Sequence, residues 1–174
     1  TKQKRTKDKR ERLRNAAIKE FAQNGITHTA ITKITKRAGV ATGTFYSYFQ
    51  DKESLLEEVL AEHFAHVADE LQQGRDKLER GEEYKDVPNQ IQAIRNLFDT
   101  LIRLNIDNSD LFITWYRYGY GHTKEIDALI SGHIQALEAM SIDDMERSGT
   151  IAQSDIPILA QCVISLCMGM CQHI

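Results

Sequence analysis

The strongest constraint on the fold is a pair of short amphipathic runs separated by a glycine, within residues 27–56. The first run (31–38) carries its apolar residues at helical spacing and ends at Gly39. The second run (42–49) follows almost at once, with two phenylalanines on one side and small polar residues on the other. Two short helices joined by a tight glycine turn predict a helix-turn-helix, whose second helix is shaped to enter the DNA major groove.

A wider pattern of fixed spacings surrounds this motif and includes the preceding helical segment RLRNAAIKEFAQNG. Over residues 12–56 the pattern resembles the TetR family of bacterial transcriptional regulators. The matching residues are Ala16, Ala17, Phe21, Gly25, Thr29, Ile34, Ala38, Gly39, Val40, Gly43, Phe45, Tyr46, Phe49, Lys52, Leu55 and Leu56. The resemblance implies a three-helix DNA-binding domain followed by a helical domain that senses small molecules.

Two positions depart from the family pattern. Thr35 stands where a small Ala is usual because two helices cross closely there, and its hydroxyl can bond back to a carbonyl of its own helix. Ala41 stands where many members place Ser or Thr as an N-cap. Because Ala is a poor cap, the cap can shift to Thr42, which leaves open the side chain that holds the start of the second helix.

Charge is divided unevenly along the 174 residues, although the net charge is only −3. Residues 1–52 carry 13 Lys and Arg against 4 Asp and Glu, a net charge of +9, whereas residues 53–174 carry 9 against 21, a net charge of −12. A basic head on an acidic body is expected when only the head meets a polyanion.

The remaining composition favours a cytoplasmic protein with no membrane partner. The chain has no 18-residue apolar run free of polar interruption and no signal peptide at its start. Cys162, Cys167 and Cys171 all lie in one apolar run without zinc spacing. They are expected to be buried thiols, with a redox sensor as the alternative because Cys167 and Cys171 share a helix face.

Few prolines and glycines and the absence of an alternating strand pattern predict an all-α fold. Residues 1–51 are expected to form the DNA-binding domain with a basic, mobile arm over residues 1–7. Residues 52–174 are expected to form a ligand-sensing and dimerisation domain, and the resemblance implies that a final helix is missing. The predicted helices span about 8–24, 30–37, 42–48, 52–73, 88–107, 111–121, 123–147 and 156–174, with a surface loop or frayed helix over 74–87.

Ten residues are predicted to contact DNA. Thr42, Gly43, Thr44 and Ser47 occupy the groove-facing positions, and none offers the paired hydrogen bonds of Arg, Asn or Gln. Selectivity is therefore expected from apolar contacts, DNA shape and water. The other six residues are expected at phosphates or at the groove edge, with Tyr48 and Lys52 as backbone clamps by resemblance: Thr29, Thr32, Lys33, Tyr46, Tyr48 and Lys52.

The body is predicted to hold an apolar or aromatic effector, because aromatic residues gather near residues 98–120 and two histidines lie on otherwise apolar helix faces. The alternative is that these side chains are ordinary core. His63 and His66 could suggest a metal pair, but no carboxylate partner is evident, so no metal is predicted. The candidate ligand-binding residues are His63, Val67, Phe98, Ile102, Phe112, Trp115, Tyr116, His133 and Leu137.

The last predicted helix is apolar nearly all round, and such a helix must be covered on all sides. A second copy of the chain is the natural cover, through Ile158, Cys162, Leu166 and Met170. The sequence thus favours a homodimeric regulator, by analogy a repressor, that binds palindromic double-stranded DNA and is released by a small molecule. The rivals are a DNA-binding organiser controlled by a protein partner and, least favoured, an enzyme. No cofactor is predicted.

Overall fold

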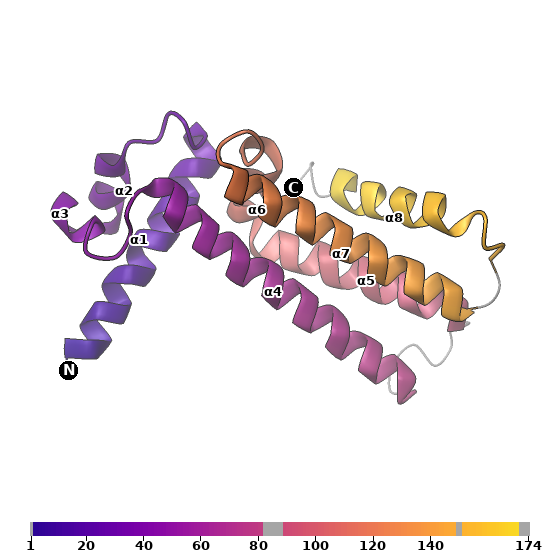
Figure 1. The fold of residues 1–174 in the computed structure, drawn as a ribbon. Helices are drawn as coiled ribbons and strands as arrows, with labels where there is room; N and C mark the ends of the chain where they lie inside the picture. The colour runs from indigo at the N-terminus through magenta and orange to yellow at the C-terminus, as the bar shows by residue number, and fades with distance from the viewer. Residues whose placement is uncertain (1, 82–88, 149–150, 171–174) are drawn as a thin grey trace. The chain divides into compact units, whose positions relative to one another are not determined.

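A computed structural model of the protein describes residues 2–81, 89–148 and 151–170, and within these ranges the chain contains helices and no strand. This agrees with the all-α prediction. The helices are α1 (Lys2–Asn24), α2 (Ile31–Ala38), α3 (Thr42–Phe45), α4 (Lys52–Glu79), α5 (Asn89–Asp107), α6 (Ser109–Tyr118), α7 (Lys124–Ser148) and α8 (Ile156–Met170) (Figure 1).

The chain divides into two compact units, and each unit is built from two separate stretches of sequence. The first unit comprises Thr1–Glu62 and Asn108–Ile130, and the second comprises His63–Asp107 and Ser131–Ile174. Helices α4 and α7 therefore each contribute one end to each unit. The functional boundary predicted between residues 51 and 52 stays a prediction, since the compact units divide within α4.

The first unit packs α1, α2 and α3 around a core of fully buried side chains. Phe21 of α1, Ile34 of α2 and Phe45 of α3 have no exposed surface. Helix α6 packs against α1, where the Thr114 hydroxyl donates a hydrogen bond to the carbonyl of Ile18 at 3.5 Å. The burial of these apolar groups, rather than helix propensity, is what stabilises helices as short as α2 and α3.

The turn between α2 and α3 depends on glycine. Gly39 ends α2 with φ +64° and donates its backbone N–H to the carbonyl of Lys36 at 3.2 Å. The next residue, Val40, donates to the carbonyl of Thr35 at 3.0 Å, so two terminal carbonyls of α2 are satisfied. Because glycine alone adopts this backbone conformation without a steric penalty, the sequence can turn here within a few residues.

Several predicted helix ends differ in the structure, including those of α1, α3 and α4, and α6 lies two to three residues earlier than the predicted 111–121. Helix α1 begins at Lys2, so the expected mobile arm is helical. Helix α4 continues to Glu79 through Gly74, although residues 74–79 were expected to lie in a loop or frayed helix. Helix α3 keeps its α-helical form only over Thr42–Phe45 and continues as a hydrogen-bonded turn through residues 46–48. Residues 82–88 of the predicted loop lie outside the described part of the chain.

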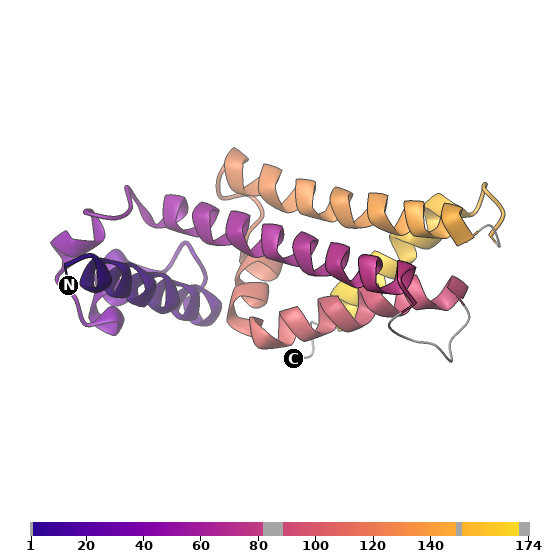
Figure 2. The same cartoon turned by 90° about the horizontal axis from the view of Figure 1, so that it is seen from below.

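The second unit packs α5 on α8, with the ends of α4 and α7 beside them (Figure 2). Its core includes a cluster of Met145, Ile156 and Ala160. On α5, Ile91 is 53 % exposed, whereas Leu97 and Leu104 are buried. Three buried residues of α5 are polar, which apolar spacing alone could not reveal. They are Asn96, Thr100 and Asn105.

Candidate nucleic-acid interface

Helix α3 is held in place by two phenylalanines that anchor the motif from inside. Phe45 and Phe49 are buried, and their ring centroids lie 5.6 Å apart. The guanidinium of Arg10 lies over the Phe49 ring at 5.5 Å from its centroid, a cation–π contact that joins α1 to the end of the motif. The opposite side of α3 is thereby fixed as a surface.

That surface carries the four residues predicted to face the major groove. Thr42, Gly43 and Ser47 are exposed, and Thr44 is half-buried. No atom lies within 4 Å of the position that a Cβ of Gly43 would occupy, so the backbone there is open to close approach. The Ser47 hydroxyl donates to the carbonyl of Gly43 at 3.4 Å. The structure therefore presents small side chains and open backbone together.

The start of α3 is held differently from the expected side-chain cap. Ala41 is the N-cap residue and makes no side-chain cap hydrogen bond, while its carbonyl accepts the backbone N–H of Thr44 at 2.8 Å. The Thr42 hydroxyl shares a hydrogen bond of 3.3 Å with the Thr35 hydroxyl, which also donates to the carbonyl of Thr32 at 3.2 Å. The back-bonding expected of Thr35 is thus present, and it ties α2 to α3.

The residues expected at phosphates and at the groove edge are mostly accessible. Tyr46 is 59 % exposed, Tyr48 is half-buried, and Thr32 and Lys33 are exposed on α2. Lys33 also lines a shallow hollow of about 370 Å³, which sequence reasoning missed, together with Glu20, Lys36 and Arg37. The positions of Lys33, Lys36 and Arg37 at steps of three and four were the available signal.

Thr29 is a correction to the predicted contacts. Its side chain is 1 % exposed, and its hydroxyl donates to the carbonyls of Gly25 at 2.8 Å and Glu20 at 3.2 Å. A buried hydroxyl with two backbone partners fixes the end of α1 and the following turn. The Thr29 side chain therefore has no free surface to offer to DNA.

Lys52 begins α4, and Asp51 acts as the N-cap of this helix. The Asp51 carboxylate accepts the backbone N–H of Ser54 at 2.7 Å, and the Ser54 hydroxyl accepts the backbone N–H of Asp51 at 3.2 Å. The Lys52 ammonium donates to three carbonyls of the turn between α1 and α2. The half-buried Lys52 is thus hydrogen-bonded within the protein, and the phosphate contact expected of it stays a prediction.

Ion pairs join α1 to the beginning of α4 within the first unit. Arg10 pairs with Glu58, and Arg14 pairs with both Glu58 and Glu62. The Arg14 side chain is only 13 % exposed. Burial lowers the pKa of Arg14, but its hydrogen bond and charge interactions with the carboxylates, above all that of Glu62, outweigh this and raise the pKa overall. These arginines are therefore occupied within the fold.

The predicted ligand-binding residues of the second unit form part of its interior. Val67 and Leu137 are buried, and so are His63 and His133. The His133 ring stacks on Phe64 with the ring centroids 4.0 Å apart. Burial lowers the pKa of each histidine to about 4, with smaller contributions from His66 at His63 and from His63 at His133. Both imidazoles are therefore neutral at pH 7. Phe98 and Ile102 are half-buried.

The other three predicted ligand-binding residues belong to the first unit. Phe112 and Trp115 are buried and Tyr116 is half-buried. Their rings form a cluster in which the Phe112 and Tyr116 centroids lie 5.3 Å apart in a stacked arrangement. The nine candidates are thus divided between the two compact units.

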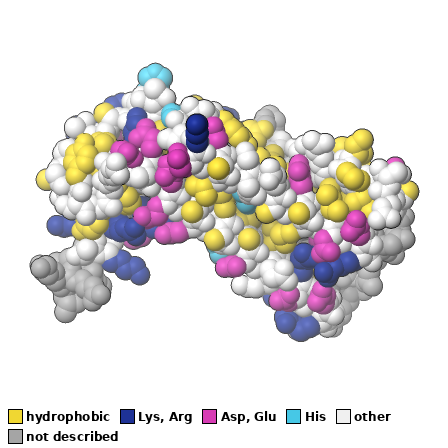
Figure 3. Space-filling view, in the orientation of Figure 1, with side chains coloured by type: hydrophobic (Ala, Val, Ile, Leu, Met, Phe, Trp, Pro, Cys, Tyr) yellow, Lys and Arg dark blue, Asp and Glu magenta, His cyan; other side chains and the backbone are white. Residues whose placement is uncertain are grey.

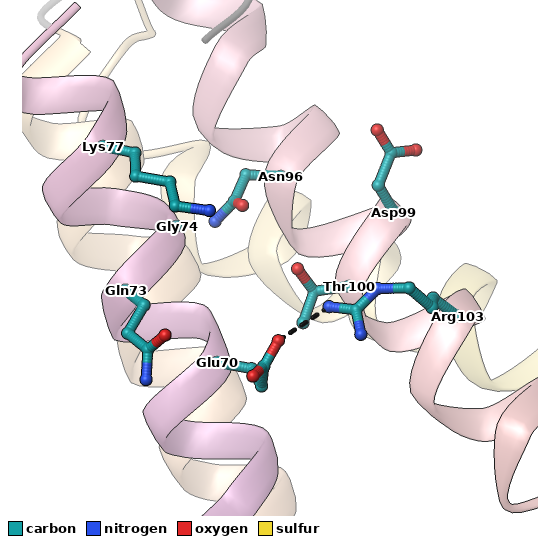
Figure 4. A pocket seen from close by; sticks show the side chains of 8 residues that line it. All are labelled: Glu70, Gln73, Gly74, Lys77, Asn96, Asp99, Thr100 and Arg103. Carbon is teal, nitrogen blue, oxygen red and sulfur yellow. Dashed lines mark hydrogen bonds and ion pairs between the residues drawn. The ribbon is translucent and has the colours of Figure 1, made fainter. Parts of the chain in front are cut away.

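A polar groove lies in the second unit between α4 and α5, and sequence reasoning did not anticipate it (Figure 4). It has a volume of about 270 Å³ and contains none of the nine ligand candidates. Glu70 and Arg103 face each other across it in an ion pair of 2.8 Å, and the hydrogen bond from Arg103 lowers the pKa of the Glu70 carboxyl. Its lining is Glu70, Gln73, Gly74, Lys77, Asn96, Asp99, Thr100 and Arg103.

Helix α8 leaves part of its apolar surface uncovered, and hydrophobic side chains are visible over it in Figure 3. Ile158 is 67 % exposed and Leu166 is 59 % exposed, and Cys162 is also exposed. Cys167 is buried, as expected, whereas Cys162 is not. The side chain of Met170, the fourth predicted interface residue, and Cys171 lie outside the described part.

The described residues contain no group of three or more His, Cys, Asp or Glu side chains that could hold a metal ion. Within the same part of the chain, no helix is both long and apolar enough to cross a membrane.

Comparison with known proteins identifies relatives of the helix-turn-helix. Residues 13–59 match the family described as bacterial regulatory proteins, tetR family. The HTH-type transcriptional regulator YvdT of Bacillus subtilis is 35 % identical over 68 residues, which are 39 % of this chain and 35 % of that protein. The match therefore spans about a third of the relative's length.

Similar folds extend over nearly the whole chain. The fatty acid degradation regulator FadR from Bacillus halodurans has a TM-score of 0.74 at 20 % identity, with 95 % of this chain and 82 % of that chain covered. FadR from Bacillus subtilis, solved in complex with stearoyl-CoA, has a TM-score of 0.68 at 18 % identity, with 92 % and 84 % covered. At these identities the likeness shows a shared fold. The named relatives are regulators and not enzymes.

Proposed function

This chain belongs, through its helix-turn-helix, to the TetR family of bacterial regulatory proteins, and on that premise we propose that it is a ligand-responsive transcriptional regulator. It binds a palindromic operator as a homodimer, represses transcription and is released by a small apolar or aromatic effector. The observation that carries the proposal is the exposed face of α3, where small polar side chains and open glycine backbone stand on a buried phenylalanine anchor.

The DNA contacts that we propose follow from exposure. Thr42, Gly43, Thr44 and Ser47 lie in the major groove, and Tyr46 and Tyr48 reach the phosphates beside it. On α2 the exposed Thr32 and Lys33 contact the other edge of the groove. Lys36 adds positive charge there, whereas the charge of Arg37 is paired with Glu20 at 2.6 Å. Neutralised phosphates release counterions, so this basic surface should make binding strongly dependent on salt.

The decisive experiment is selection of bound duplexes from a random pool at near-physiological salt, which suppresses binding that ignores sequence. A two-fold symmetric motif is the expected result, with half-sites about one DNA turn apart, roughly 34–36 Å. Gly43→Glu is the matched negative variant, because it places a carboxylate at an exposed position with no neighbouring atoms. Gln135→Glu makes the same charge change at an exposed position of α7 and should select the wild-type motif.

An absent motif in the wild-type protein, with its helices intact by circular dichroism, would remove the operator-binding proposal. A motif retained by Gly43→Glu would instead move the reading surface away from α3. Either outcome is distinct from failure of the effector proposal, which concerns release rather than binding.

The effector is proposed to bind among the candidate residues of the second unit, and to favour an arrangement of the dimer in which the two helix-turn-helix motifs do not fit the operator. Helix α4 is the proposed link, because one continuous helix carries Lys52 at its start and His63 further along. The FadR structure solved with stearoyl-CoA makes long-chain acyl-CoAs the first probes for operator release. Phe98→Ala and Ile102→Ala, at half-buried positions, should weaken release while leaving operator affinity unchanged. An operator complex that no probe releases would favour control by a protein partner.

Homodimerisation is proposed through α8, where Ile158, Cys162 and Leu166 offer an apolar surface that the described chain leaves exposed. A two-fold axis would place two copies of α3 on the two halves of a palindrome. Sedimentation at micromolar concentration should therefore give the mass of two chains, and a monomer at that concentration would contradict this part of the proposal.

A further inference from the structure

The turn between α1 and α2 presents three backbone carbonyls to a single ammonium group. The Lys52 Nζ lies 2.6 Å from the carbonyl oxygen of Ile26, 3.2 Å from that of Thr27 and 3.1 Å from that of Thr29. An ammonium group has three donors and no acceptor, so this arrangement uses its full hydrogen-bonding capacity. One side chain from the first residue of α4 thus gathers a turn that lies more than twenty residues earlier in the sequence.

The turn is otherwise held by the buried side chains of Ile26 and Thr29 and by few hydrogen bonds of its own. Gly25 leaves α1 with φ +73°, and a single backbone hydrogen bond of 3.2 Å joins the N–H of Thr29 to the carbonyl of Ile26. The Thr29 hydroxyl secures the α1 side of the turn through Gly25 and Glu20. Carbonyls in such a connection need partners, and Lys52 supplies a charged one to three of them at once.

We propose that Lys52 is a positioning residue. It fixes the start of α2 to the first turn of α4 and does not contact a DNA phosphate. The proposal deepens the proposed operator binding and depends on it for the functional meaning of the position. It assigns the phosphate contact expected of Lys52 to the exposed lysines of α2 instead. Helix α2 begins at Ile31, two residues after Thr29. The three hydrogen bonds from Lys52 to the turn, which form the Lys52 clamp, therefore set the placement of Thr32 and Lys33.

The Lys52 clamp also connects the first turn of α4 directly to the helix-turn-helix. A displacement of that turn pulls three carbonyls of the α1–α2 turn with it, because all three bonds end on one nitrogen. The start of α2 then moves with α4, whereas an ammonium held by DNA would leave the turn free in the absence of an operator. The two roles therefore predict different behaviour in the protein without DNA.

The first test uses that difference in the wild-type chain. Lysine acetylation is followed residue by residue with mass spectrometry, with and without the selected duplex. Lys52 should react about tenfold or more slowly than exposed Lys33 and Lys36 before any DNA is added, because charged hydrogen bonds must break first. Equal rates without DNA, with protection of Lys52 appearing only on the duplex, would overturn the proposal.

The second test compares two replacements of the same lysine. Lys52→Arg keeps the charge and suits a phosphate, but a planar guanidinium cannot direct three donors to three converging carbonyls. Lys52→Arg and Lys52→Gln should therefore both lose about tenfold or more in duplex affinity, and hydrogen exchange at the Thr29 amide should quicken in both. Restored affinity in Lys52→Arg would overturn the proposal, because a phosphate clamp tolerates this change.

The salt dependence of affinity separates the two roles further. Removal of one phosphate contact lowers the slope of log affinity against log salt by about 0.9. Lys33→Gln, the matched control, should show this change, whereas Lys52→Gln should lose affinity with an unchanged slope. If a Lys52 variant does not fold, the wild-type acetylation rates still decide. If the wild-type protein binds no duplex, the proposed operator binding is wrong. The acetylation rates without DNA still test whether Lys52 is held by the carbonyls of the turn.

Discussion

The helix-turn-helix and α8 use their apolar side chains in opposite ways. In the helix-turn-helix, Ile34, Phe45 and Phe49 are all buried within one chain. In α8 one side is buried, but Ile158 and Leu166 remain more than half exposed. The first region is complete as it stands, whereas the second has apolar surface that the described chain does not cover. Apolar side chains therefore form a closed core in one region and leave exposed surface in the other.

The largest expected effect comes from breaking the complete region. Phe45→Ala removes a ring with no exposed surface and should cost about 3–5 kcal/mol of unfolding free energy, because a cavity replaces packed core. Chemical denaturation followed by circular dichroism measures it. Tyr46→Ala, at the neighbouring exposed position, should change stability by no more than about 0.5 kcal/mol. Equal losses in the two variants would show that the motif does not pack as described.

The second unit should make the unfolding free energy depend on pH through its two buried histidines. The pKa values of His63 and His133 are about 4 when folded, below the ordinary value of 6.5. Between these values the unfolded chain binds more protons, so stability is complete above pH 6.5 and falls as the pH drops toward 4. Each histidine can contribute on the order of 3 kcal/mol, and the two contributions are coupled.

Unfolding free energies measured from pH 7.5 to 4.5 test this dependence. His133→Gln should flatten the curve, whereas His28→Gln, at an exposed position of the first unit, should leave it unchanged. A wild-type stability that stays constant over this range would show that the two imidazoles are not buried as described.

A charge on the uncovered side of α8 tests whether this surface mediates self-association. Leu166→Glu should weaken self-association about 10- to 100-fold, which corresponds to the 1.5–3 kcal/mol of one buried aliphatic side chain. The stability of the single chain should barely change, because the position is exposed there. Sedimentation equilibrium measures the association, and Gln153→Glu adds the same charge just before α8 as a control. Unaltered association in Leu166→Glu would place the interface elsewhere.

The smallest expected effect concerns the turn of the helix-turn-helix. Gly39→Ala forces a left-handed residue to carry a Cβ, which would lie 2.7 Å from the guanidinium of Arg12, and should cost about 1–2 kcal/mol. Gly43→Ala, in open helical surroundings, should be neutral or stabilising by up to about 1 kcal/mol. Thermal unfolding of the two variants compares them directly. A stable Gly39→Ala would mean that the turn has another conformation available.

The sequence predicts the helix-turn-helix well because its constraints are local. Gly39, the buried phenylalanines and the Asp51 cap each act within a few residues, so spacing alone reveals them. The body is harder to predict because its constraints are tertiary. Helix α4 runs through Gly74, which an isolated helix would disfavour but which lets Asn96 of α5 approach.

The candidate site shows the same limit. Exposed polar positions on α3 follow directly from helical periodicity, since Phe45 and Phe49 define the opposite face. The roles of Thr29 and Lys52 do not, because their hydrogen-bond partners are carbonyls of a turn whose shape is not written in side-chain pattern. A threonine or lysine beside a DNA-reading motif can serve the fold or the ligand, and only the geometry separates the two.

The small side chains of α3 have a consequence for how such a protein would select its operator in a genome. In the proposed complex, the threonines, serine and glycine of this surface contribute little discrimination per base pair. None of them can make a bidentate base contact, which is worth about 1–3 kcal/mol of discrimination. Competition from about 10⁶–10⁹ other sites must then be overcome by adding small preferences over many base pairs. Single base changes in such an operator would lower the affinity by small steps. Related sequences would therefore form a graded series of binding sites rather than one bound sequence among unbound ones.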